Sequence, residues 1–382
     1  MIPYSEFNFF YIMSILLIPA ILLGLNGKVN KKYNIIVSLI MLIVIFGNSK
    51  IQSFCLIAFF LGELILVKLN LYIVKKHKNK WMMRAFVLLS LIPLLITKYS
   101  HFFQHKYILG FLGVSYLTFK VIQIIVETYD GLIKDINIVE FAYFILFFPT
   151  ISSGPIDRSR RFNEDFNKVL STEEYSIILK SGLYKLFQGV LYKFIIGNII
   201  FNFWLGSVPS PHTLLNTLNY MYAYSLYLFF DFAGYSRMAI GTSHILGIST
   251  PENFNMPFLS KDIKDFWNRW HISLSTWFRD FIYTRYVMSS MKAKRFKSRY
   301  TASYIGYFIT MVTMGIWHGT EIYYILYGIY HGMLIVLTDY FQRKSKWYKE
   351  NSKNQFWEII FTVLTFNLVC FGFLIFSGYL FK

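Results

Sequence analysis

Apolar runs close to twenty residues long recur from one end of the chain to the other, separated by short polar or basic turns. A helix that spans a bilayer needs about 20 consecutive, mostly apolar residues. The pattern predicts roughly eleven such helices, at about 8–25, 33–47, 51–74, 84–97, 107–126, 138–151, 178–203, 214–230, 302–318, 322–341 and 356–379. We therefore expect an all-α, polytopic membrane protein that forms a single membrane-embedded domain over residues 1–382.

Two stretches depart from this pattern of plain spans. Residues 149–161 contain the turn signal Gly154-Pro155, which is typical of a re-entrant segment or of a simple basic loop. Residues 265–281, taken as one helix, place tryptophans on one face and charged residues on the other, which indicates an amphipathic helix at the membrane boundary. His271 falls on its apolar face, where it is either a satisfied core residue or a functional group.

Composition narrows the class further. The chain is 55% hydrophobic and 15% charged, whereas soluble domains carry about 25% charged residues. No polar stretch is long enough for a soluble domain, so nucleic-acid binding is excluded. Cys55 and Cys370 lie in apolar segments and are expected to be small core residues. No cysteine–histidine cluster has zinc spacing, so we expect no metal site.

The net charge of +18 is concentrated in loops. Lysines cluster at 28–32 and at 75–80, and the positive-inside rule places both loops in the cytoplasm of a cell-membrane protein, with the N-terminus outside. The N-terminal segment lacks the basic start of a signal peptide and is predicted to be a membrane helix. A basic run at 343–349 would then face outward, so some of the eleven segments are expected to be re-entrant. A basic cytoplasmic face favours anionic membrane lipid or an acidic partner.

One apolar stretch carries the strongest candidate for chemistry. His318 lies between Gly315 and Gly319 in a membrane segment, where an ionisable side chain indicates a functional site by default. Small residues four apart allow a second helix to approach closely. The pattern Gly-Ile-aromatic-His-Gly recurs at 328–332, so His331 is a second candidate, and sequence spacing alone does not choose between them.

Two further polar residues are candidates for a supporting site. Asp231 lies within an apolar segment, where it is either a substrate or proton site or, as we favour, a structural ion pair or helix cap near a break at Gly234. Asn268 lies close to His271 on the predicted interfacial helix.

The basic stretch after that helix, residues 285–299, places the apolar residues Val287, Met288 and Met291 among lysines and arginines. It is either a solvated, headgroup-facing loop or a dock for an acidic protein. The docking hypothesis involves Arg285, Val287, Met288, Lys292, Lys294 and Arg295.

Taken together, these motifs resemble the membrane-bound O-acyltransferase family. The resemblance covers about residues 110–335. It rests on Ser153-Gly154-Pro155-Ile156, on residues 230–236 (FDFAGYS), 251–258 (PENFNMPF) and 266–280 (FWNRWHISLSTWFRD), and on Trp317-His318-Gly319. Residues 1–4 (MIPY), 111–120 and 147–158 are similar to the branch of the family that moves D-alanine toward teichoic acids.

The resemblance implies an MBOAT-like fold and acyl transfer with His318 as the essential histidine, His271 as the second site residue and His331 in support. It implies a donor thioester on the phosphopantetheine arm of an acidic cytoplasmic carrier protein, with no cofactor bound to the chain itself. The expected acceptor is a hydroxyl of teichoic acid or of another molecule, reached with a membrane-anchored partner. Direct transfer is expected, with His318 as general base and His271 orienting the reactants or steadying the oxyanion.

Three alternatives remain. The polysaccharide O-acetyltransferase branch usually has an aspartate where this chain has Arg237, and a Pro-Leu-Gly-Gly turn where it has residues 285–288. A transporter of D-alanyl or lipid-linked substrates would use broken helices and Asp231. A non-catalytic scaffold would tolerate loss of His318.

Overall fold

The computed structural model describes residues 1–100, 110–209 and 213–381 of the chain. Over these residues the protein is helical, with one isolated antiparallel bridge between Phe254 and Trp270. The described chain divides into two compact units, 1–190 with 234–251 and 191–233 with 252–382. Each unit is described below by itself.

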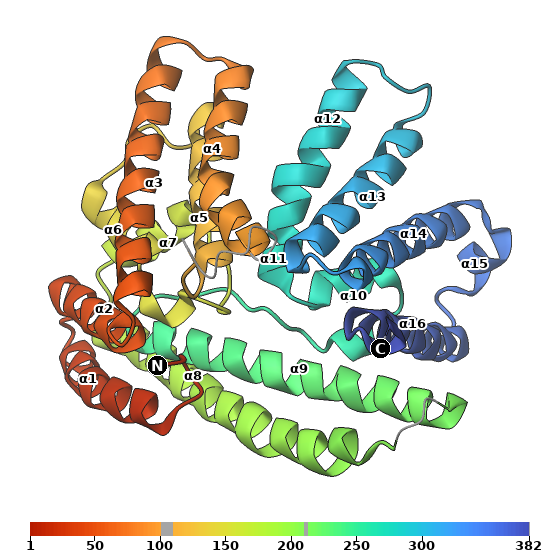
Figure 1. The fold of residues 1–382 in the computed structure, drawn as a ribbon, viewed down its shortest axis with the longest axis horizontal. Helices are drawn as coiled ribbons and strands as arrows, with labels where there is room; N and C mark the ends of the chain where they lie inside the picture. Colours follow the sequence, from red (N-terminus) through yellow and green to blue (C-terminus); the bar gives the residue numbers. More distant parts are fainter. Residues whose placement is uncertain (101–109, 210–212, 382) are drawn as a thin grey trace. The chain divides into compact units, whose positions relative to one another are not determined.

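The first unit is built mainly from helices α1 to α8. Their bounds are α1 Phe7–Leu25, α2 Lys31–Phe46, α3 Lys50–Lys76, α4 Lys80–Tyr99, α5 Val114–Asp130, α6 Ile138–Ile145, α7 Ser159–Asn167 and α8 Thr172–Val190. The long helices α3 and α4 run side by side and both contact α5 (Figure 1). The end of α9, Leu214–Ile245, also belongs to this unit.

Short polar turns define where these helices begin. The side chain of Asn30 accepts a hydrogen bond from the backbone N–H of Tyr33 at the start of α2. Ser49 caps α3, and Asn79 caps α4, in the same way. Such a cap satisfies one of the backbone donors that a helix start leaves unpaired. The turns therefore separate one apolar helix from the next through local hydrogen bonding.

Six described helical segments are long and apolar enough to cross a membrane, which agrees with a multi-pass membrane protein. They are Phe7–Leu25, Lys50–Lys76, Lys80–Tyr99, Thr172–Ser207, Ile322–Lys344 and Gln355–Phe376. The span predicted at 138–151 is wrong, because α6 has only eight residues and is followed by a short 3-10 turn. The span predicted at 107–126 begins partly outside the described residues, and α5 covers the rest.

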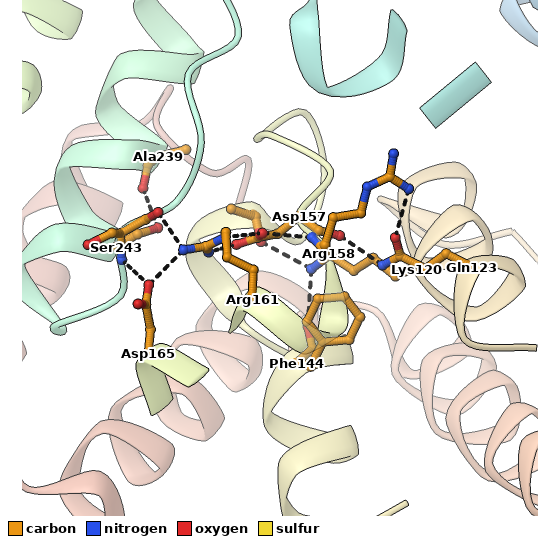
Figure 2. A network of polar contacts seen from close by, with 11 residues as sticks. Lys120, Gln123, Phe144, Asp157, Arg158, Arg161, Asp165, Ala239 and Ser243 are labelled. Atoms are coloured by element: carbon orange, nitrogen blue, oxygen red, sulfur yellow. Dashed lines mark hydrogen bonds and ion pairs between the residues drawn. The ribbon is translucent and has the colours of Figure 1, made fainter. Parts of the chain in front are cut away.

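The predicted helix break at Gly154-Pro155 is confirmed, since α7 begins only at Ser159. Figure 2 shows a polar network beside this break. Arg161 donates through Nε to Asp157 Oδ1 at 2.7 Å and through Nη1 to Asp165 Oδ2 at 2.7 Å. Gln123 of α5 donates to the backbone oxygen of Asp157 at 2.8 Å.

Lys120 is the most deeply buried cation of this network, with 1% of its surface exposed. Its Nζ donates to Phe144 O and to Thr150 Oγ1, both at 3.1 Å (Figure 2). A buried cation is tolerated only when such partners replace water. The charged groups here therefore hold a non-helical segment against α5, which supports a structural interpretation of Asp157 and Arg161.

The second unit contains the first part of α9 and all helices after it. Their bounds are α10 Ile263–Arg269, α11 Ile272–Phe278, α12 Thr284–Lys292, α13 Arg299–His318, α14 Ile322–Lys344, α15 Lys346–Asn351 and α16 Gln355–Phe376. Segments of wider, π-helical turns lie at Leu191–Gly197, Ile200–Trp204 and Arg279–Tyr283.

Helices α13 and α14 pack closely because glycines meet at their contact. A Cβ atom added at Gly315 would lie 2.4 Å from Tyr324 O and 3.3 Å from the Cα of Gly328. A Cβ added at Gly328 would lie 2.4 Å from Met311 O. The repeated Gly-x-x-His-Gly pattern thus places one glycine of each copy against the other helix, which confirms the close approach predicted from spacing.

We expect Gly328→Ala to destabilise the protein by about 1–3 kcal/mol, because the added methyl group overlaps backbone atoms of α13 that cannot move independently. The measurement is the thermal unfolding midpoint of purified protein in detergent. Gly62→Ala is the matched control, since a Cβ at that helical glycine meets no atom within 4 Å. Equal midpoints for the two variants would show that the α13–α14 contact tolerates a wider separation.

Candidate active site

The predicted single helix over residues 265–281 is wrong. The structure contains α10 and α11, separated at Trp270 and His271, and π-helical turns from Arg279. His271 has φ 43° and ψ 53°, a left-handed conformation that is unusual for a residue with a Cβ atom. Backbone strain of this kind persists only where surrounding contacts enforce it, and it gathers at functional sites.

Asn253 provides the contacts that enforce this break. Its backbone oxygen accepts from Ile272 N at 2.9 Å. Its side-chain Oδ1 accepts from Ser273 N at 3.2 Å and from Ser273 Oγ at 2.6 Å. Asn253 is fully buried, so these bonds are shielded from water and strong. On the other side of His271, Asn255 N donates to Arg269 O at 3.0 Å, so the segment 253–255 holds both flanks of His271.

His318 is the last residue of α13, and Gly319 continues in extended conformation. A cavity of about 110 Å³ lies between its imidazole and that of His271. The residues that line this cavity, named here the histidine cavity, are Leu228, Phe232, Trp267, Trp270, His271, Leu274, Met314, His318, Tyr327, Phe373 and Phe376. The two imidazoles that the sequence singled out, 47 residues apart, thus open on one space.

The electrostatics of His271 follow from its burial. Only 3% of the residue is exposed, and its ring packs edge-on against Phe232 with 4.7 Å between centroids. Burial, with a smaller contribution from the charge of His318, lowers the pKa of His271 to about 3. His271 lies outside the six candidate spans. It is therefore neutral at physiological pH and can donate one hydrogen bond and accept another.

His331 does not line the histidine cavity. It is fully buried and lies edge-on to Trp267 and Tyr327, with centroids 5.2 and 4.6 Å away. Both of those rings line the cavity. A Cβ at Gly372 of α16 would lie 2.4 Å from His331 Nε2, so glycine there makes room for the ring. His331 therefore lies behind the cavity wall, and its predicted supporting role stays a prediction.

A second cavity, of about 250 Å³, shares Trp267 and Met314 with the histidine cavity. Asn268 lines this second cavity and not the first. Its other lining residues include Thr276 and Tyr283, the latter directly before α12. The two cavities together give a succession of spaces between the start of α12 and the histidines.

Asp231 is outside both cavities and forms an ion pair with Lys193 of the first π-helical segment. This agrees with the structural ion pair favoured from the sequence. Its neighbour Phe232 lines the histidine cavity. Asp231 is therefore adjacent in sequence to a lining residue but does not line the cavity itself.

The basic stretch forms α12 and the turn that follows it. Met288 and Met291 expose 65% and 52% of their surface. Val287 is half-buried, with its Cγ2 close to Gly306 of α13. The turn forms an open cavity of about 510 Å³ whose lining includes Lys294 and Arg295. We define the α12 surface as Arg285, Met288, Met291, Lys292, Lys294 and Arg295; Val287 belongs to the packing beneath it.

Sequence reasoning missed several residues of the site. Asn253 lay within a recognised motif but had no assigned role, and its burial between two loops is not visible in a pattern. Tyr327, Phe373 and Phe376 come from α14 and α16, in which apolar residues lie all round and no single position stands out. Only the packing of these helices shows which rings face the cavity.

Chemically, the histidine cavity offers two imidazoles, the buried His271 and the partly buried His318, in an otherwise apolar space. Such a site can transfer a proton to or from a bound hydroxyl while keeping water away. Within the described residues, no group of three or more His, Cys, Asp or Glu side chains is placed to hold a metal ion. The arrangement suits general base catalysis of group transfer to an alcohol.

Comparison with known proteins tests the family resemblance independently of the structure. Residues 82–377 match the family model described as MBOAT, membrane-bound O-acyltransferase family. The chain is 46% identical to the teichoic acid D-alanyltransferase of Bacillus subtilis (strain 168), covering 99% of this chain and 98% of the relative. It is 42% identical to the teichoic acid D-alanyltransferase of Lacticaseibacillus rhamnosus, covering 100% and 98%.

A second group of relatives matches over a shorter length. The probable alginate O-acetylase AlgI of Pseudomonas syringae pv. tomato is 33% identical over 70% of this chain and 49% of its own length. The match to the D-alanyltransferases therefore extends over nearly both whole chains, whereas the match to the acetylase leaves half of that relative uncovered.

Proposed function

The chain belongs to the membrane-bound O-acyltransferase family and is an acyltransferase, and from this premise we propose that it moves D-alanine from a carrier-bound thioester across the cell membrane toward teichoic acid. The observation that carries the proposal is the histidine cavity, which His271 and His318 line together. The full-length relatives support D-alanine as the acyl group. In this proposal the immediate acceptor hydroxyl belongs to teichoic acid, to a lipid carrier or to a membrane-anchored partner protein.

In the proposed reaction, His318 is the general base. Its neutral imidazole takes the proton of the acceptor hydroxyl while the hydroxyl oxygen bonds to the carbonyl carbon of the D-alanyl thioester. The carbon–sulfur bond breaks, and the proton passes from His318 to the departing sulfur. His271, neutral and rigidly held by its flanks, donates to the oxygen that becomes negative as the carbonyl is attacked.

The phosphopantetheine arm of the carrier would reach the histidines through the second cavity. Its walls run from Tyr283, beside α12, to Trp267 and Met314, which it shares with the histidine cavity. A long, thin arm fits such a succession of small spaces, whereas a folded carrier does not. The carrier itself would stay at the α12 surface, which the positive-inside rule assigns to the cytoplasm.

The α12 surface has the features of a dock for an acidic carrier. Exposed methionines offer apolar, adaptable contact, and the surrounding lysines and arginines attract negative charge and speed encounter. Exposed methionine between basic residues is an unusual combination for a surface that only faces water.

The test of the proposed function is transfer of labelled D-alanine from a loaded carrier to teichoic acid by purified protein in detergent micelles. Transfer without a sealed membrane is the expected result, and a transporter would give none. A carrier loaded with an acetyl group tests the alternative suggested by the alginate acetylases. If the protein preferred the acetyl donor, its activity would be O-acetyl transfer and the proposed D-alanyl transfer would be wrong.

We expect Met288→Asp to raise the KM for loaded carrier about tenfold and to leave kcat nearly unchanged, because it removes an exposed apolar contact and repels an acidic partner. The measurement is steady-state transfer over a range of carrier concentrations. Met288→Leu keeps the apolar contact and is the matched control. An unchanged KM for loaded carrier in the aspartate variant would show that the carrier binds elsewhere than at the α12 surface.

A further inference from the structure

The lining of the histidine cavity is unusual in what it offers a charged substrate. Six aromatic side chains line it, Phe232, Trp267, Trp270, Tyr327, Phe373 and Phe376. The remaining lining residues are the two histidines, two leucines and a methionine. No carboxylate, amide or aliphatic hydroxyl is among them. The volume of about 110 Å³ is roughly the space of four water molecules, which suits a group as small as D-alanyl.

A D-alanyl thioester differs from an acetyl thioester mainly by its α-ammonium group. A cation that enters a water-poor space needs a partner, and the usual partner is a carboxylate. The carboxylates nearest in sequence to the lining do not reach it: Asp231 pairs with Lys193, Asp265 pairs with Arg269, and Glu321 is exposed and outside the lining. The cavity therefore has to hold the ammonium group without an acid.

The aromatic rings can supply that partner, since the face of an aromatic ring carries partial negative charge and attracts cations, most strongly where water is excluded. Phe373 and Trp270 lie with centroids 4.7 Å apart at an angle of 46°, and Phe373 is 2% exposed. Phe266 stacks beneath Trp270 at 5.6 Å, and His331 supports Tyr327 from behind. The rings are thus held in place before a substrate arrives.

We propose that the aromatic wall of the histidine cavity, with Trp270 and Phe373 at its centre, binds the α-ammonium group of the aminoacyl donor by cation–π interaction and so selects an aminoacyl over an acetyl group. The proposal rests on the proposed D-alanyl transfer.

The test compares donors that differ only in the ammonium group. Carriers are loaded with D-alanyl or with propionyl, which has the same carbon skeleton without nitrogen, and the ratio of the two kcat/KM values is measured. We expect wild type to favour D-alanyl. Phe373→Leu should reduce the ratio about threefold to tenfold, Phe373→Tyr should restore it, and Phe366→Leu, on the same helix but outside the lining, should leave it unchanged.

The pH dependence of this ratio separates a bound cation from a bound neutral amine. An α-amino group loses its proton near pH 7.7–8.0, so the preference for D-alanyl should fall as pH rises through about 8. The groups that face the donor are His271, His318 and Tyr327. Because kcat/KM reports the ionisation of the free enzyme, which is the same for both donors, their effect cancels in the ratio. A preference that rises with pH, or a ratio that Phe373→Leu leaves unchanged, would overturn the proposal.

Inhibition of the wild-type protein by small amides tests the ammonium site without any variant, so the result does not depend on whether a variant folds. D-alaninamide, a cation, should inhibit transfer more strongly than propionamide at the same concentration, and equal inhibition would contradict the aromatic ammonium site. Absence of D-alanyl transfer together with efficient acetyl transfer would instead refute the proposed function. Normal D-alanyl transfer with no donor preference would refute only the ammonium site.

Discussion

We expect replacement of His318 with alanine to lower the proposed D-alanyl transfer by about 10²–10⁴-fold, the contribution of a positioned general base. The loss should appear in kcat, because in the proposed mechanism the imidazole acts on the proton of the acceptor hydroxyl and not on the carrier, whose proposed dock is the α12 surface. Release of labelled D-alanine from loaded carrier to acceptor, followed over time, gives the rate.

The control for this experiment is His77→Ala, at the exposed C-terminal end of α3. It removes an imidazole of the same kind from a place without a cavity and should retain full activity. Circular dichroism and thermal unfolding in detergent should be the same for both variants and wild type. A near-normal kcat for the His318→Ala variant would show that His318 is not the general base. Either another group would then be the base, or the chain would be a non-catalytic scaffold.

Replacing His271 with glycine should lower the transfer rate by about 10²–10³-fold, the effect of losing one donor to a developing oxyanion. Glycine adopts the left-handed conformation of this position without strain. The backbone between α10 and α11 should therefore persist, held by Asn253. Unfolding midpoints measure the fold, and single-turnover transfer measures the chemistry.

The matched variant is His271→Ala, which also removes the imidazole but keeps the backbone strain of about 1–2 kcal/mol. It should be as inactive as the glycine variant and less stable. If glycine at this position retained most of the activity, the ring would serve only to fill space against Phe232. Equal stability of the two variants would argue against strain at the break.

Sequence reasoning was most successful where a property is local. Helices α3, α4 and α16 lie close to the predicted spans because hydropathy is summed over neighbouring residues and needs no tertiary contact. The same reasoning failed over 265–281, where the spacing of tryptophans is equally compatible with one helix or two. The break there depends on hydrogen bonds from Asn253, a residue about twenty positions earlier.

By itself, the sequence determined the helical membrane class and the motifs of the family, because each follows from residue type and spacing. The choice of His318 and His271 ahead of His331 came from the family resemblance and stays a prediction. Only the tertiary structure decided that His271 and His318 open on one cavity while His331 stands behind its wall. It also assigned Asp231 to an ion pair and Val287 to the packing under the α12 surface. The reason is physical: whether a polar side chain faces a cavity or a neighbouring helix is set by contacts between segments far apart in the chain, which no local pattern contains.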